Sequence, residues 1–146
     1  MSRASFTVRN VPADRTIHIR MSGRFDISTM RAFCDQYKAV TDTYAKGAHY
    51  VIADMRGMVP AQPEVGLMLG SAIGYARARG VRLCAHLSDD TVQRLQAARL
   101  ARQSTPGDDV TVDVASLEEA ARVIAEHREQ ERERERERDR QQLEHR

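Results

Sequence analysis

The chain has 146 residues, 41% of them hydrophobic and 30% charged, which suits one globular domain that buries its core without metal or disulfide support. A net charge of +2 predicts no strong attraction to nucleic acid or membranes, and two cysteines, Cys34 and Cys84, are too few for the disulfide framework of a small secreted protein. The N-terminus lacks an apolar segment and no run nears the ~20 apolar residues of a membrane span, so a soluble cytoplasmic protein without membrane insertion is expected.

The first elements in chain order are two strands and a helix. Residues 6–9 and 16–23 alternate with period two around a polar NVPADR loop, which predicts an antiparallel hairpin. From Asp26 the period becomes helical, and Lys46-Gly47 is typical of a helix end. The stripe expected to face the core comprises Ile27, Met30, Cys34, Tyr37, Thr41 and Tyr44.

The rest of the body alternates between strands and helices. Strands are predicted at 49–55, 82–87 and 110–114, and helices at 63–79 and 89–103. A last helix follows Ser116, which forms a capping-box pattern with Glu119. The order β-β-α-β-α-β-α-β-α predicts an α/β fold with a mixed, mostly parallel sheet of four to five strands and flanking helices.

The C-terminal segment differs in composition from the body. Residues 128–146 carry seven Arg, six Glu and one Asp, so this segment is neutral and residues 1–127 keep the net charge of +2. On a helix, its alternating charges place opposite signs at i,i+3 and like signs at i,i+4. Without apolar a and d positions it is no self-sufficient coiled coil, so we predict a body at 1–127 and a charged tail at 128–146, either a helical extension or disordered.

The loop from Arg56 to Gln62 is the longest that follows the carboxyl end of a predicted parallel strand. Ligands and partners of open α/β sheets commonly bind at this edge. Pro63 suits a first helical position, and Glu64 falls in the first turn, where a carboxylate is stabilised by ~0.3–1 kcal/mol. Ordinary helix-start chemistry explains Glu64, and a fixed charge for partner recognition is the alternative.

Two short motifs flank this region. Gly23-Arg24-Phe25-Asp26 opens a helix after the hairpin, and Asp54-Met55-Arg56-Gly57 ends a strand before a loop and a Gly-containing helix. This arrangement, over roughly residues 6–126, resembles the STAS domains, which are named for sulfate transporters and anti-sigma factor antagonists. The resemblance implies a STAS-like fold and regulation by binding, since the family's antagonists dock on an anti-sigma kinase.

Phosphorylation of a Ser or Thr at the start of the second helix breaks that complex in the family. This chain has Gln62-Pro63-Glu64-Val65-Gly66 at the corresponding place, so no hydroxyl is available there. A permanent negative charge from Glu64 would only partly imitate a phosphate, which has more charge and more acceptor oxygens. The resemblance therefore implies docking without the family's phosphorylation switch.

Gly66, Gly70 and Gly74 recur at every fourth position of the second helix. Each internal glycine lowers helix propensity by ~1 kcal/mol relative to alanine, so the row needs a reason. Two readings are open. The row forms a flat groove for a partner helix or an identical subunit, or it permits close packing inside the domain.

No pattern in the sequence indicates catalysis or metal binding. Cys84 and His86 share a strand face, but no second pair of ligands stands at metal spacing. Ser71 lies inside a predicted helix rather than on a nucleophile elbow, and no glycine-rich phosphate-binding loop is present. We therefore expect no enzyme activity, no cofactor and no metal.

The sequence as a whole predicts a non-catalytic regulatory or scaffold module that binds a protein partner through this loop and helix. The expected partner is an anti-sigma kinase-like protein or a scaffold component, and a homo-oligomer is left open. The alternative is a STAS-like domain that binds a nucleotide or lipid, although the Glu64 carboxylate would compete with an anionic ligand. The predicted contact residues are Asp54, Arg56, Met58, Val59, Glu64, Gly66, Gly70 and Gly74.

Overall fold

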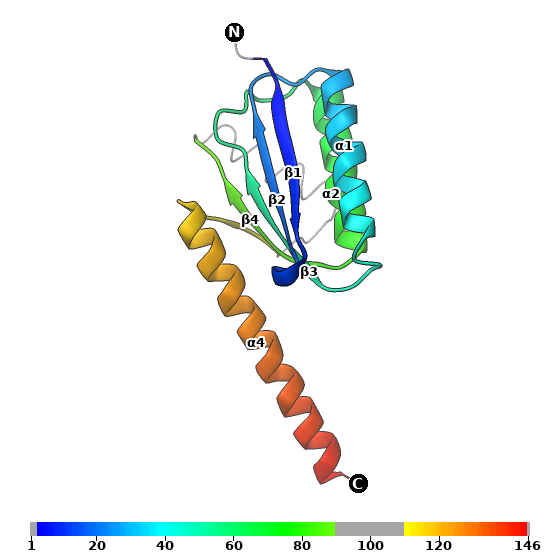
Figure 1. Ribbon diagram of the computed structural model, residues 1–146, viewed down its shortest axis with the longest axis vertical. Helices are drawn as coiled ribbons and strands as arrows, with labels where there is room; N and C mark the ends of the chain where they lie inside the picture. Colours follow the sequence, from blue (N-terminus) through cyan, green and yellow to red (C-terminus); the bar gives the residue numbers. More distant parts are fainter. Residues whose placement is uncertain (1–2, 90–109, 146) are drawn as a thin grey trace.

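The computed structural model describes residues 3–89 and 110–145 as an α/β fold, with helices on both faces of one sheet (Figure 1). The strands are β1 (Ser5–Val11), β2 (Thr16–Ser22), β3 (His49–Asp54), β4 (Val81–Leu87) and β5 (Thr111–Asp113). The helices are α1 (Ile27–Asp42), α2 (Pro63–Ala78) and α4 (Leu117–Glu144), and the short 3-10 helix η1 (Pro12–Asp14) links β1 to β2. Apart from Asp89, the helix predicted at 89–103 lies outside the described residues.

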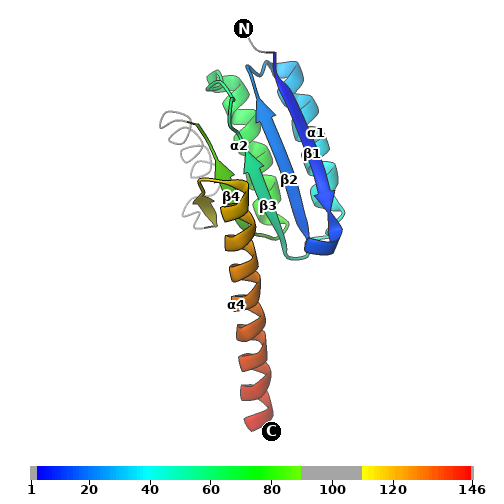
Figure 2. The same cartoon turned by 60° about the vertical axis from the view of Figure 1, so that its left-hand side comes forward.

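The sheet has the strand order β1-β2-β3-β4-β5, so neighbours in the chain are neighbours in space. β1 and β2 form an antiparallel hairpin, whereas β2, β3, β4 and β5 run parallel. The predicted mixed, mostly parallel sheet is therefore confirmed. The crossovers from β2 to β3 and from β3 to β4 advance in one direction, so right-handed connections place α1 and α2 on the same face (Figure 2).

Each face of the sheet carries its own apolar core. On one face, Ile17, Ile19 and Met21 alternate along β2 and belong to the same cluster as Phe33 of α1 and Leu69 of α2. On the other face, α4 packs on β3 and β4. The second core contains Tyr50, Ile52, Leu83, Ala85, Leu87, Val114, Ala120 and Ile124. Because helices cover both sides of β3, every residue of that strand is buried.

Helix α1 is shorter than its predicted range. It ends at Asp42, and the chain then turns through Ala45 and Lys46, which both have positive φ. Tyr44 consequently leaves the helical stripe, and its ring stacks on His49 with centroids 4.7 Å apart. Ile27 was expected in the core, but at the first position of the helix its side chain is 43% exposed.

Helix α4 begins with the predicted cap and continues through the charged tail. The Ser116 hydroxyl accepts a hydrogen bond from the Glu119 N–H at 3.0 Å. The Glu119 carboxylate accepts one from the Ala115 N–H at 2.9 Å, one residue further back than the capping-box pattern predicts. The tail is a helical extension as far as Glu144. Among the described helices, none has both the length and the apolar composition needed to cross a membrane.

Candidate functional site

The two short motifs of the sequence meet at one edge of the molecule. The Gly23 N–H donates to the Gly57 carbonyl at 2.9 Å, and the Val59 N–H donates to the Gly23 carbonyl at 3.0 Å. Both glycines have positive φ, and a Cβ on Gly23 would lie 2.2 Å from the Arg3 carbonyl oxygen. The loop after β3 is therefore fixed to the segment that enters α1. The starts of α1 and α2 lie at this same edge (Figure 1).

Asp54 and Arg56 hold the first part of this loop. The Arg56 guanidinium donates from Nε to Asp54 Oδ1 at 2.9 Å and from Nη2 to Oδ2 at 2.8 Å. The Arg56 backbone N–H adds a third hydrogen bond to Oδ1 at 3.2 Å. The side-chain hydrogen bond from Arg56 lowers the pKa of the Asp54 carboxyl, although burial opposes the shift. Asp54 is thus an ionised residue that orders the loop through Arg56. Only 6% of Asp54 is exposed, so its carboxylate acts from inside the protein.

The other predicted contact residues divide into exposed and buried positions. Arg56 and Glu64 are exposed, and Val59 and Gly74 are partly exposed. Met58 is only 8% exposed and belongs to the core under α1 and α2, so it does not supply the exposed apolar contact that the sequence suggested. Asp54, described above, is also buried.

Gly66 and Gly70 are buried as well. Helix α1 contacts a different side of α2, where the Cys34 thiol donates to the Met68 carbonyl oxygen across 3.6 Å and the Tyr75 hydroxyl donates to Asp42 at 2.7 Å. Of the two readings of the glycine row, close packing inside the domain therefore applies at Gly66 and Gly70. These glycines do not line a surface groove.

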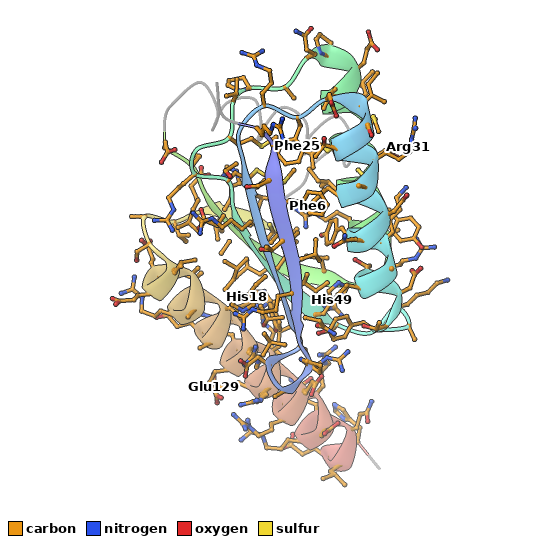
Figure 3. All side chains as sticks on the ribbon, turned by 45° about the horizontal axis from the view of Figure 1, so that its top comes forward. Phe6, His18, Phe25, Arg31, His49 and Glu129 are labelled. Atoms are coloured by element: carbon orange, nitrogen blue, oxygen red, sulfur yellow. The ribbon has the colours of Figure 1, made fainter. Side chains whose placement is uncertain are left out.

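An open groove does lie between the starts of α1 and α2. Its floor includes Phe25, which is buried and whose ring centroid lies 6.4 Å from that of Phe6 (Figure 3). The groove is lined by Arg24, Phe25, Asp26, Ile27, Ser28, Gln62, Glu64 and Val65. Residues 24–28 and 62–65 are far apart in the sequence, and no local pattern predicts that they lie side by side.

Two large apolar side chains at this edge are exposed to solvent. Ile27 is 43% exposed at the groove, and Leu67, on the helical turn after Glu64, is 66% exposed. Leu67 was missed, although its position off the buried stripe of Val65, Leu69 and Ala72 was readable from the helical period. The exposure of Ile27 could not be read in this way, because it fits the α1 stripe.

The charged groups around the groove are mainly acidic. Asp26 caps α1 by accepting the Thr29 N–H at 2.7 Å, and this hydrogen bond lowers the pKa of its carboxyl. Glu64 is exposed in the first turn of α2, where Gln62 provides no side-chain cap. Arg24 is the cation among the lining residues. The groove therefore combines exposed apolar surface with an ionised rim.

Within residues 3–89 and 110–145, no group of three or more His, Cys, Asp or Glu side chains could hold a metal ion. Residues 57–66 contain no hydroxyl group. A scan against models of known protein families matches none of them, and no curated protein matches the sequence.

Proposed function

We propose that this chain is a non-catalytic regulatory or scaffold module that docks on a protein partner through the α1–α2 edge. We use this name for Arg24–Ser28, the loop 56–62 and the exposed start of α2. The observation that carries the proposal is the exposure of Ile27 in the groove with Asp26 and Glu64, together with the exposure of Leu67 near the start of α2. An apolar centre with a charged rim is typical of protein–protein contact surfaces.

The rigidity of the edge supports the same function. The Asp54–Arg56 pair and the Gly23–Gly57 hydrogen bond hold the loop before any partner arrives. A preformed surface loses little conformational entropy on binding, which favours affinity. The resemblance to STAS domains points to the same surface, and the absence of a hydroxyl at 57–66 makes docking there independent of phosphorylation at that place.

Quantitative affinity capture from cells that naturally contain the protein tests this function. We compare the native chain with Leu67→Asp and with Leu143→Asp, since Leu143 is 67% exposed on the tail and Leu67 is 66% exposed on α2. At least one partner protein should be captured equally by the native chain and by Leu143→Asp. The amount captured by Leu67→Asp should be at least about tenfold lower, as expected when a buried apolar anchor is lost. If Leu67→Asp, folded by circular dichroism, retains every protein that the native chain retains, the edge is not the docking surface.

The small-ligand alternative has less support. The cavity between the sheet, α1 and α2 has about 50 Å³, below the about 300–1,000 Å³ of sites for drug-sized ligands, whereas the open groove at the α1–α2 edge has about 650 Å³. Glu64 would also repel an anionic group at the start of α2. No thermal stabilisation by nucleotides or lipids is expected, and a saturable stabilisation would favour the alternative.

A further inference from the structure

The last part of α4 leaves the body of the molecule. Beyond Arg128 the helix continues to Glu144 and points away from the sheet (Figures 1 and 2). We call residues 129–144 the α4 extension. Its side chains are exposed, apart from the partly exposed Glu131, and Glu129 projects from the outer side of the helix (Figure 3). Over 16 residues the extension is about 24 Å long.

The charges of the extension form ridges of a single sign. Residues four apart lie on the same ridge of an α-helix, and the sequence alternates acid and base at every step from Glu131 to Arg140. Every ridge is therefore wholly acidic or wholly basic, and at 3.6 residues per turn neighbouring ridges lie about 90° apart with opposite sign. The acidic ridges are 129/133/137 and 131/135/139, and the basic ridges are 128/132/136/140 and 134/138.

Within one helix these ridges are only partly neutralised. Glu129 contacts Arg132 at 3.5 Å and Arg136 at 3.1 Å, so attraction acts between ridges. Along each ridge, however, like charges repel at i,i+4. A second helix that sets basic ridges against acidic ones would offset this repulsion without any apolar contact.

We propose that the α4 extension docks on the α4 extension of a second copy of this chain, with the two helices parallel. Neighbouring ridges always differ in sign. A two-fold axis parallel to the helices therefore sets an acidic ridge against a basic ridge on both flanks of the contact. An antiparallel two-fold pair sets each flank against itself, so like charges meet at its centre.

The charge balance of the extension favours its own copy over other partners. From 128 to 146 the net charge is zero, which gives no field to attract nucleic acid or anionic lipid. Leu143 is the single large apolar side chain from 129 to 145, so there is no apolar face for a membrane or an amphipathic helix. An open groove beside the extension, lined by Arg82, Glu131, Arg134, Glu135, Glu137, Arg138 and Gln141, leaves its ridges accessible.

Sedimentation of the full chain tests the electrostatic contact. Salt shortens the range of charge–charge interaction from about 30 Å at 0.01 M to about 3 Å at 1 M. We expect dimers at the lower salt concentration. At the higher concentration the affinity of the two copies for each other should be at least about tenfold weaker. A chain that is monomeric at both concentrations, or equally dimeric at both, overturns the proposal.

Charge exchange tests the ridges themselves. One variant replaces Glu131, Glu135 and Asp139 with Arg, and the other replaces Arg132, Arg136 and Arg140 with Glu. Each variant should be monomeric alone at low salt, and an equimolar mixture of the two should form a heterodimer. Circular dichroism checks that both variants keep their helix content. The matched control exchanges Arg122 and Glu126 on the part of α4 that packs on the sheet, and it should dimerise like the native chain. Dimers of either ridge variant alone would contradict the pairing.

A cysteine near the end of the extension tests the direction. With parallel helices, Gln142→Cys places two thiols side by side, and mild oxidation should give a disulfide-linked dimer that the native chain does not form. In an antiparallel pair centred near residue 135 the two thiols would lie about 20 Å apart. Dimers that never form this cross-link would rule out the parallel arrangement.

Discussion

At the scale of single residues, the α1–α2 edge depends on a buried carboxylate. Asp54 accepts three hydrogen bonds from Arg56, and its ionised form is favoured because the guanidinium lies against it. Arg56 itself is exposed, so the side chain that orders the loop also lies at the surface. Glu64, in the first turn of α2, is exposed as well.

Replacement of Asp54 by Asn should lower the free energy of unfolding at pH 7 by about 1–3 kcal/mol, because a buried charged acceptor is lost. The folded-state pKa of Asp54 is lowered, so its contribution is present above the unfolded value near ~3.9 and is lost as pH falls through the folded value. Urea denaturation of both proteins at pH 7 and near pH 2 measures this. If the free energies of unfolding of the two proteins differ equally at both pH values, the charge of Asp54 does not contribute to stability.

At the scale of elements, α2 serves two surfaces at once. Its buried side carries Val65, Leu69 and Ala72 together with Gly66 and Gly70, and its exposed side carries Glu64 and Leu67. The burial of Gly66 and Gly70 places both glycines inside the domain rather than on its surface. The buried and the exposed residues of α2 thus occupy different sides of one helix.

Gly70→Leu should therefore act on stability rather than on a partner directly. Additional side-chain atoms in this buried contact should cost about 1–3 kcal/mol through overpacking. Thermal unfolding of Gly70→Leu against Ser71→Leu provides the comparison, because Ser71 is the exposed neighbour on the same helix. Equal melting temperatures would mean that the packing around Gly70 has room for a larger side chain.

At the scale of the whole molecule, α4 joins the body to its extension in one continuous helix. Ala120 and Ile124 lie in the second core, and Arg128 donates to the Asp14 carbonyl at 2.5 Å while its guanidinium lies 5.2 Å from the Tyr50 ring centroid. Arg128 therefore contacts the body, although the sequence placed it in the tail. The structural limit of the body falls one residue later.

A chain that ends at Arg128 should keep the free energy of unfolding of the native chain within about 0.5 kcal/mol, because apart from the partly exposed Glu131 it removes exposed side chains only. A chain that ends at Ser116 should be strongly destabilised, since it exposes Ile52, Leu83 and Ala85. Urea denaturation at high salt, where extension pairing is screened, compares the three chains. Marked loss of stability in the first truncation would show that the extension supports the fold.

The sequence by itself determined the elements that depend on local spacing. Period-two alternation in β2, the start of α1 and the Ser116 cap are encoded within a few residues, so each was predicted close to its observed position, whereas α1 ends earlier than predicted. The mixed, mostly parallel sheet followed from the order of these elements. The charged tail was recognised from composition alone, with a helix and disorder both left open.

Only the tertiary structure decided which side chains reach the surface. Met58, Gly66 and Gly70 were predicted to contact a partner and are buried, whereas Ile27 was predicted to be buried and is exposed. Burial depends on what packs across from a residue, and at this edge the packing partners come from segments more than 30 residues apart in the chain, as in the Gly23–Gly57 hydrogen bond. Local periodicity carries no information about such contacts. The groove between α1 and α2 exists only because the fold brings the two helix starts side by side.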